Sequence, residues 1–355
     1  MLRTKVTVLA GFLGAGKTTL LNALLRDTPE PLGVIVNDFG SVNVDAALVA
    51  GKSSVEGEVA LQNGCVCCTI RGDLLTALLQ LTRRKNPPRH IVIETSGVSD
   101  PAAVARTFLD PRVSDHVQLA AIVGCVDPSE FPGLVDEQWT MASTQLKVCD
   151  FVVLTKADLV SASELAAARS LVDRLAPRAR VVQGSLDDAP TALILGTEGL
   201  WSHARLATAQ PAEMPHVHEV GHHHGHHHHH GHAFETWTYR TDAPLSTYGL
   251  RRTLAQLPAA VYRAKGFVHA AEAPEVRLLV HVVGARAELR ADGPWTDTPQ
   301  TELVFLGREG TLPTTEISKQ LDKCIHTNAQ PTVDFMDDML GYFNRLLSGM
   351  PGHVE

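Results

Sequence analysis

Apolar and polar positions follow two periods along roughly the first two hundred residues. Short apolar runs predict buried strands at residues 5–10, 33–37, 90–94, 118–126, 150–155 and 180–183. Between them, apolar residues recur at helical spacing and predict helices at 17–26, 71–84, 101–109 and 161–176. This alternation is typical of an α/β fold, with a mostly parallel sheet, helices on both faces and ligands at the carboxyl ends of the strands.

The pattern changes twice further along the chain. Residues 206–233 contain Pro211, Pro215 and a histidine-rich run, and we interpret them as a flexible linker after a first domain of residues 1–205. Strands at 234–240, 261–268, 276–283 and 301–307, with helices at 246–257 and 316–326, predict a smaller α+β domain over 234–327. The last residues, 328–355, predict an amphipathic docking helix, because the acidic polar side does not suit an anionic membrane.

Composition narrows the class of protein. With 355 residues, 44% of them hydrophobic and 20% charged, the chain has enough apolar residues for about two globular domains. A net charge of −8 argues against a general nucleic-acid binder, and no apolar run is long enough to span a membrane. The first predicted strand starts at residue 5, which leaves no room for a signal peptide. Three of the six cysteines are clustered, so we expect a reduced, cytoplasmic setting.

Residues 11–19 carry the strongest motif. Their sequence, GFLGAGKTT, fits the phosphate-binding pattern G-x-x-x-x-G-K-[ST] between a predicted strand and a predicted helix. The glycines let the backbone curl so that its N–H groups face a phosphate, and the helix start adds partial positive charge. We predict that Lys17 reaches the β- and γ-phosphates and that the Thr18 hydroxyl ligates Mg²⁺. The predicted nucleotide contacts here are Gly11, Gly14, Ala15, Gly16, Lys17, Thr18 and Thr19.

Two further strand ends fit the same site. The sequence IVIETSG ends a buried strand at Glu94, and we expect that carboxylate beside Mg²⁺ and the γ-phosphate, where it holds a metal-bound or attacking water. Lys17 and Glu94 are therefore the predicted catalytic residues. Asn37 and Asp38 leave the strand at 33–37 in the way that a switch segment does.

The segment Thr155-Lys156-Ala157-Asp158 follows another strand and predicts the base-binding part of the site. The Asp158 carboxylate can accept from both N1–H and the exocyclic amine of guanine, and adenine offers no such pair of donors. The stem of Lys156 would pack along the base. In this position the segment favours GTP over ATP.

A second centre is predicted at Gly64-Cys65-Val66-Cys67-Cys68. In an extended segment Cys65 and Cys67 point the same way and Cys68 points opposite, so a third thiolate joins a metal only if the chain bends. The set is incomplete for a tetrahedral metal and needs an outside ligand: water, Asp38, a histidine or an oxygen near the nucleotide. Thiolates select Zn²⁺, Cu⁺ or Co²⁺ over Mg²⁺. A redox pair is the alternative, while the separate Cys125, Cys149 and Cys324 are expected in the core.

Histidine is concentrated in one place. Eleven of the 18 histidines lie between His216 and His232, interrupted by glycines. Neutral imidazoles bind borderline metals, and the glycines favour several loose sites over one shaped site. We interpret this run as a metal-collecting tether, with an internal purification tag as the alternative.

Together these segments resemble the CobW-like GTPases, a family of zinc-regulated and cobalamin-associated metal chaperones. The matching sequences are GFLGAGKTT, NDFG, NGCVCC, IVIETSG, TKAD and YRAKGF, and they cover both predicted domains. The resemblance implies a P-loop GTPase domain followed by a smaller C-terminal α+β domain. It also implies that Cys65, Cys67 and Cys68 bind metal, that GTP binding organises this site, and that hydrolysis loosens the metal for transfer to a client. Asp38 stands where the family usually has Glu, and Thr155 replaces the usual Asn, which removes an amide that braces the nucleotide loop.

These observations lead to a main hypothesis and two alternatives. The main hypothesis is a slow GTPase that uses Mg²⁺ and delivers Zn²⁺ to a client metalloprotein; its turnover is slow because no Arg is placed as an arginine finger. A cobalt chaperone for cobalamin synthesis uses the same ligands, since thiolates barely separate Co²⁺ from Zn²⁺. A metal buffer based on the histidine run is the third reading. A homodimer is left open.

Overall fold

The computed structural model describes residues 3–28, 30–36, 58–60, 67–185, 188–196 and 234–326, with the side chains of 58–60 and 67–71 outside the description. The described chain divides into an N-terminal unit, residues 3–196, and a C-terminal unit, residues 234–326. The predicted linker at 206–233 and the predicted helix at 328–355 lie outside the described residues. The predicted domain boundaries therefore stay predictions.

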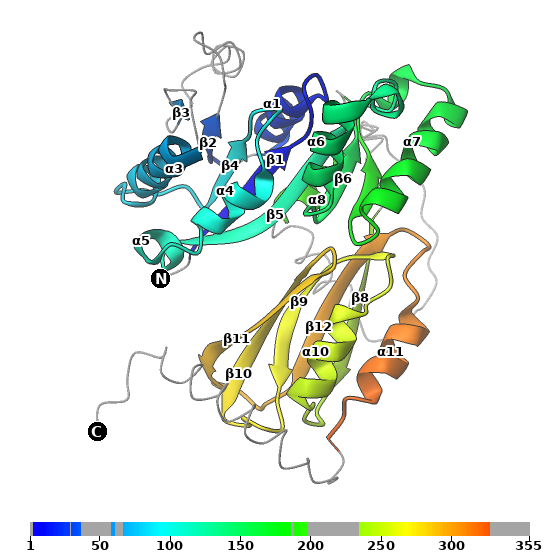
Figure 1. The fold of residues 1–355 in the computed structure, drawn as a ribbon. Helices are drawn as coiled ribbons and strands as arrows, with labels where there is room; N and C mark the ends of the chain where they lie inside the picture. Colours follow the sequence, from blue (N-terminus) through cyan, green and yellow to red (C-terminus); the bar gives the residue numbers. More distant parts are fainter. Residues whose placement is uncertain are drawn as a thin grey trace, which may run out of the picture. The chain divides into compact units, whose positions relative to one another are not determined.

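The N-terminal unit is built on a seven-stranded parallel sheet in the order β3-β2-β4-β1-β5-β6-β7 (Figure 1). The strands are β1 (Thr4–Ala10), β2 (Leu32–Val36), β3 (Glu58–Ala60), β4 (His90–Glu94), β5 (Val117–Val126), β6 (Phe151–Leu154) and β7 (Arg180–Gln183). All residues of β2, β4 and β6 are buried, as expected of parallel strands covered on both faces. The six predicted strands are all present. The sequence missed β3, which has only three residues and is too short for a periodic signal.

Helices cover both faces of this sheet. The helical elements are α1 (Lys17–Asp27), α3 (Cys67–Thr82), α4 (Pro101–Thr107), α5 (Pro111–Ser114), η1 (Phe131–Gly133), α6 (Asp136–Leu146), η2 (Ala157–Leu159), α7 (Ala162–Leu175) and α8 (Thr191–Leu195). Leucines and valines of α3, α4, α6 and α7 join the strands in one core, while α1 and α8 contact each other against the sheet's other face. The helix α6 was missed because its sequence, DEQWTMASTQL, carries few apolar residues at helical spacing.

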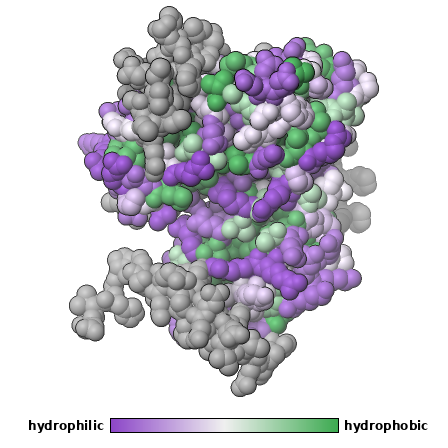
Figure 2. Space-filling model, in the orientation of Figure 1, coloured by the Kyte–Doolittle hydropathy of each residue, from purple (hydrophilic) through white to green (hydrophobic). Residues whose placement is uncertain are grey.

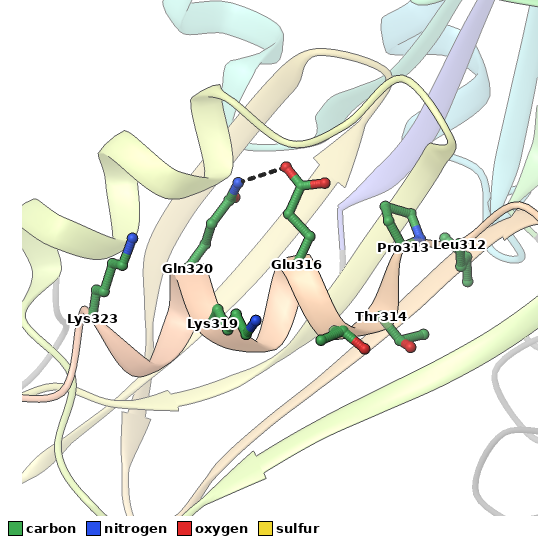
Figure 3. Close-up of a pocket in the computed structure, with 8 residues that line it drawn as sticks. Leu312, Pro313, Thr314, Glu316, Lys319, Gln320 and Lys323 are labelled. Atoms are coloured by element: carbon green, nitrogen blue, oxygen red, sulfur yellow. Dashed lines mark hydrogen bonds between the residues drawn. The ribbon is translucent and has the colours of Figure 1, made fainter.

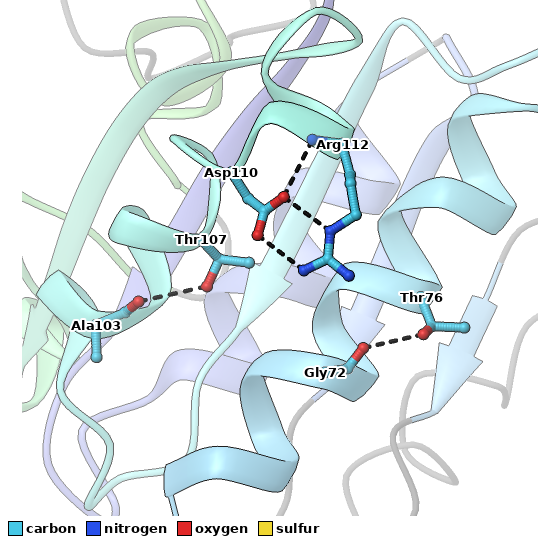
Figure 4. A network of polar contacts seen from close by, with 6 residues as sticks. All are labelled: Gly72, Thr76, Ala103, Thr107, Asp110 and Arg112. Carbon is cyan, nitrogen blue, oxygen red and sulfur yellow. Dashed lines mark hydrogen bonds and ion pairs between the residues drawn. The ribbon is translucent and has the colours of Figure 1, made fainter.

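The start of α3 corrects the predicted boundary. The helix begins at Cys67 rather than at residue 71, so Cys67 and Cys68 are helical and the strand-like alternation expected for them does not apply. The helix packs against α4 and α5. Figure 4 shows the local bonds of this region: the Asp110 carboxylate accepts from the backbone and guanidinium of Arg112, and the Thr76 hydroxyl donates to the Gly72 carbonyl. The Asp110 bonds cap the start of α5, and the Thr76 bond lies within α3 itself.

The C-terminal unit is a five-stranded antiparallel sheet in the order β11-β10-β9-β12-β8. The strands are β8 (Phe234–Thr241), β9 (Val261–His269), β10 (Val276–Val283), β11 (Arg286–Pro294) and β12 (Thr301–Arg308), with helices α10 (Thr247–Ala255) and α11 (Thr314–Asp322). Leu250, Leu254, Ile317 and Leu321 of the helices are buried against the sheet. The edge strand β11 was not predicted, because its sequence RAELRADGP is mostly polar.

Hydrophilic residues cover much of the visible described surface, with smaller hydrophobic areas between them (Figure 2). Among the helices that the structure describes, none combines the length and the hydrophobicity needed to cross a bilayer.

Gly266 explains one position of the sequence YRAKGF. A Cβ at this residue would collide with the carbonyl oxygen of Glu302 on the neighbouring strand β12. We expect Gly266→Ala to lower the free energy of unfolding of the C-terminal unit by about 1–3 kcal/mol, because the strands must separate to admit the methyl group. Denaturation followed by the fluorescence of Trp237 and Trp295 measures this.

The matched control is Gly249→Ala in α10, where the new Cβ would meet only ordinary contacts at 3.4–3.5 Å from Cys324. Alanine raises helix propensity by roughly 0.5–1 kcal/mol over glycine, so this variant should be neutral or stabilising. Equal destabilisation by both variants would contradict the collision at Gly266.

Candidate nucleotide and metal site

The phosphate-binding loop joins β1 to α1 and depends on its glycines. Gly11, Gly14 and Gly16 have φ values of 142°, 74° and 84°, a region that residues with a Cβ rarely adopt. A Cβ on Gly11 would lie 2.5 Å from the carbonyl oxygen of Cys125 on β5, and one on Gly16 would lie 3.3 Å from the Thr155 side chain. The loop therefore has the tight curl that the motif predicts.

Lys17 is held inside this curl. Its side chain is buried, and Nζ donates to the carbonyl oxygens of Gly11 at 3.0 Å and Phe12 at 3.1 Å. These two bonds use two of the three ammonium N–H donors and place the group along the loop, where the motif predicts phosphate oxygens. A cation at this point suits the charge that develops on a transferring phosphoryl group.

Thr18 and Glu94 meet at the carboxyl edge of the sheet. The Thr18 hydroxyl donates to Glu94 Oε1 at 2.6 Å, and the Glu94 side chain is only 2% exposed. Glu94 ends β4 and lies in register with Leu9 of β1, next to the start of the phosphate loop. A hydroxyl and a carboxylate oxygen side by side are the hard ligands that Mg²⁺ prefers, so these two residues fit the ion that nucleotide hydrolysis implies.

Thr155 contacts the phosphate loop through its hydroxyl. Its Oγ1 lies 2.9 Å from the Ala15 carbonyl oxygen and 3.1 Å from that of Val126, while the expected effect of the missing amide stays a prediction. The hydroxyl therefore ties the phosphate loop to the end of β5. A threonine is short enough to sit against Gly16, which has no side chain to displace it.

Lys156 and Asp158 lie in the next turn. Lys156 adopts a left-handed conformation with φ 51°, and its Nζ donates to Asp127 Oδ2 at 2.6 Å. Asp158 is in η2 and is exposed, so its carboxylate is accessible to a donor pair. The predicted base contact stays a prediction.

Asp127 is a site residue that the sequence analysis missed. It directly follows β5, and Glu94 is the last residue of β4, so the same strand-end argument could have found it. Burial is the largest influence and raises the pKa of Asp127, but hydrogen bonds from Lys156 and Ser129 outweigh it and lower that pKa below its ordinary value. Asp127 is therefore a buried carboxylate that anchors Lys156.

The structure describes only part of the predicted set of metal ligands. Asp38 and Cys65 lie outside the described residues, and only the backbone of Cys67 and Cys68 is described, in the first turn of α3. Cys125, Cys149 and Cys324 are buried free thiols, as predicted. Burial raises the pKa of Cys125 to about 12 and raises the pKa of Cys149 well above its usual range, so both stay protonated and are poor metal ligands.

A cavity of about 560 Å³ lies beside α11 in the C-terminal unit (Figure 3). Its described lining comes from residues 312–323 alone, where Gln320 donates to Glu316 across one helical turn. It contains no residue that the motifs predict for nucleotide or metal.

The fold and the phosphate loop define a nucleotide-binding protein of the P-loop class. The chain matches the model of the CobW/HypB/UreG nucleotide-binding domain over residues 5–183 and that of the cobalamin synthesis protein cobW C-terminal domain over residues 234–325. The chain therefore belongs to the CobW/HypB/UreG family and carries the CobW-type C-terminal domain. The predicted family and fold class are confirmed.

Several relatives are similar along most of their length. The chain is 30% identical over 330 residues to the zinc chaperone CobW of Sinorhizobium sp, covering 85% of this chain and 92% of the relative. It is 28% identical over 389 residues to the zinc-regulated GTPase metalloprotein activator 1 of Dictyostelium discoideum, covering 92% of this chain and 80% of the relative. The crystal structure of the Zn(II)-bound YjiA GTPase from E. coli is 24% identical to this chain, with a TM-score of 0.41. The alignment covers 91% of this chain and 99% of that chain.

Removing the Thr155 hydroxyl should weaken nucleotide binding. Thr155→Val keeps the shape but leaves the Ala15 carbonyl oxygen without this donor, while Val126 keeps the bond from the Thr155 backbone N–H at 2.8 Å. Such a loss costs about 1–1.4 kcal/mol, or roughly five- to tenfold in affinity. A titration with a fluorescent GDP analogue measures the change. Thr155→Ser restores the donor and should bind within about twofold of the wild type; a weakening as large as that of Thr155→Val would contradict the brace.

The lowered pKa of Asp127 should make the free energy of unfolding depend on pH in the acid range. Because its folded-state pKa is lowered, its contribution is complete above the unfolded pKa of about 3.9 and is lost as the pH falls through the folded-state pKa. We expect the free energy of unfolding of Asp127→Asn to fall less than that of the wild type between pH 5 and the acid limit. Denaturant titrations at several pH values measure this, with the exposed Asp158→Asn as a control that should follow the wild type.

Proposed function

We propose that this protein is a GTPase that binds Zn²⁺ at its cysteine motif and passes the ion to a client protein according to its nucleotide state. The relatives named zinc chaperone and zinc-regulated GTPase favour zinc over cobalt, and they favour a chaperone over a metal buffer. The cysteine cluster suits a reducing compartment, and we propose a cytoplasmic location on that ground.

One structural observation supports the coupling of nucleotide to metal. Ala60 of β3, Val36 of β2, Glu94 of β4 and Leu9 of β1 are paired across the sheet and form a single row at its carboxyl edge. Neighbouring strands lie about 4.8 Å apart, so Ala60 is roughly 10 Å from Glu94. The segment that carries the cysteines leaves β3 at this row, and the segment of Asn37 and Asp38 leaves β2 at the same row.

This arrangement supports the proposed coupling, because the chain that leads to the proposed metal ligands starts roughly 10 Å from Glu94. The strand β2 lies between β4 and β3, so we expect a change at Glu94 or Thr18 on loss of the γ-phosphate to affect first the chain that follows β2. Switch segments of this type are ordered by the γ-phosphate and released on hydrolysis. We therefore assign the bistable element to the chain after Val36 together with the cysteine segment.

The described residues also support the chemistry of hydrolysis. Lys17 would neutralise the β- and γ-phosphate oxygens while water attacks the γ-phosphorus and the bond to the bridging oxygen breaks. Thr18 and Glu94 would hold Mg²⁺, which supplies further charge neutralisation when bound. The Glu94 carboxylate would also accept a hydrogen bond from the attacking water. Asp158 and the stem of Lys156 would bind the guanine base.

The test measures zinc affinity in two nucleotide states. Competition with a chromogenic chelator should give a Zn²⁺ affinity that differs by roughly 5- to 150-fold between protein with a non-hydrolysable GTP analogue and protein with GDP. By linkage, Zn²⁺ should change the ratio of the two nucleotide affinities by the same factor. Cys67→Ala should remove the high-affinity site and Lys17→Ala should remove the difference between nucleotides.

Cys324→Ala, which removes a buried thiol in the other unit, is the control and should keep the wild-type Zn²⁺ affinity. Equal Zn²⁺ affinity with both nucleotides would overturn the proposed switch, even if the protein hydrolyses GTP.

A further inference from the structure

Helix α6 carries a buried amide that holds two carbonyl oxygens of a distant segment. Gln145 is 2% exposed, and its Nε2 donates to the carbonyl oxygens of Gly97 at 2.9 Å and Ser99 at 3.0 Å. Because both partners are acceptors, only the amide nitrogen fits this position, and both of its N–H groups are used. We call these two bonds the Gln145 clamp.

The clamp is fixed by the core of the N-terminal unit. Ala142 and Leu146, three residues before and one residue after Gln145, both belong to the hydrophobic core. A long side chain on a helix that is packed in this way has few alternative rotamers. The amide can therefore set the position of the segment that it holds.

The clamped segment, residues 95–99, follows β4 directly. Its first residue is tied to β1, because the Thr95 backbone N–H and hydroxyl both donate to the carbonyl oxygen of Leu9, at 2.9 Å and 3.0 Å. Within the described part of the chain, the hydrogen bonds that join residues 97–99 to another element both come from Gln145. The later part of the segment therefore depends on the Gln145 clamp.

The clamped segment also packs against the phosphate loop. A Cβ added at Gly97 would lie 2.7 Å from Leu13 Cδ2 and 2.8 Å from the Leu13 backbone nitrogen, so the two backbones are in close contact. The residue before Leu13 is Phe12, whose carbonyl oxygen accepts from Lys17 Nζ at 3.1 Å. A movement of the segment would therefore reach the group that holds Lys17.

Gln145 borders the nucleotide site itself. The cavity beside the phosphate loop has a volume of about 460 Å³ and belongs to that site, since Gly11, Gly14 and Ala15 line it. Gln145 is among its other lining residues. The clamp is therefore next to the predicted phosphate contacts and not in a remote part of the fold.

We propose that Gln145 is a positioning residue for phosphate binding. It holds the segment 95–99 as a wall against which the phosphate loop rests, and in this way it keeps Lys17 in place. The contacts run from the Gln145 amide to Gly97, from Gly97 to Leu13, and from the adjoining carbonyl to Lys17. The inference rests on the proposed function, because the contact of Lys17 with phosphate is part of it.

The test separates phosphate contacts from base contacts. Gln145→Met keeps the length of the side chain and removes both donors, and competition with a fluorescent GDP analogue gives the affinities for GDP, GMP and ADP. The ratio of the GDP affinity to the GMP affinity reports the contact of Lys17 with the β-phosphate, and we expect it to fall at least about fivefold. The ratio of the GDP affinity to the ADP affinity reports the base contact and should stay within about twofold of the wild type.

Both ratios are independent of the fraction of folded protein, so a merely structural role of Gln145 would change neither. Gln145→Asn is a second variant, which keeps the amide but is one methylene too short to reach both carbonyl oxygens. It should lower the GDP-to-GMP ratio in the same direction, which keeps the test decisive if Gln145→Met does not fold.

Ser143→Ala is the matched control on the same helix. The Ser143 side chain is buried, and its hydroxyl has no hydrogen-bond partner among the described residues, so its removal should leave both ratios at the wild-type values. A GDP-to-GMP ratio that is unchanged in both Gln145 variants would overturn the proposal, and so would an equal fall of both ratios.

A wild-type protein that binds GMP as tightly as GDP would overturn the phosphate contact of Lys17 and this inference with it. That failure is seen without any substitution, so it is distinguishable from a failure of the Gln145 clamp alone.

Discussion

The hydrogen bond between Thr18 and Glu94 is the contact on which the N-terminal unit depends for its chemistry. It joins the first turn of α1 to the end of β4 and fixes the phosphate loop at the carboxyl edge of the sheet. Gly11 also lies against Cys125 of β5, and the hydroxyl of Thr155, which follows β6, bonds to Ala15. Four strands, β1, β4, β5 and β6, thus contact one loop, as a preorganised phosphate site requires.

The same edge brings together segments that are far apart in the sequence. Ala60, Val36 and Glu94 share one row of the sheet, so the chain that leads to the cysteines begins about 10 Å from the residue that contacts the phosphate loop. Parallel pairing makes this possible, since all strands end on one side. A metal motif on a connection at the amino ends of these strands would be separated from Glu94 by the length of the strands.

The C-terminal unit is stabilised by a different packing arrangement. Its antiparallel strands carry one apolar face against α10 and α11, and its edge strand β11 is polar, which protects an exposed edge from pairing with another chain. Gly266 is required by the close approach of β9 to β12, not by a turn. The sequence YRAKGF at residues 262–267 is thus explained in part by strand packing, and Arg263 within it is almost fully buried.

The sequence by itself determined the strands with apolar runs, the phosphate loop and the family, because burial of hydrophobic residues and the glycine curl are local requirements. It did not reveal the short β3, the polar β11 or α6, whose residues carry little periodic signal. Only the tertiary structure showed that Asp127 anchors Lys156, that the Thr155 hydroxyl bonds to the Ala15 carbonyl, and that Cys67 and Cys68 open a helix. Those facts depend on distances between separate strands and loops, and residue spacing along the chain does not contain them.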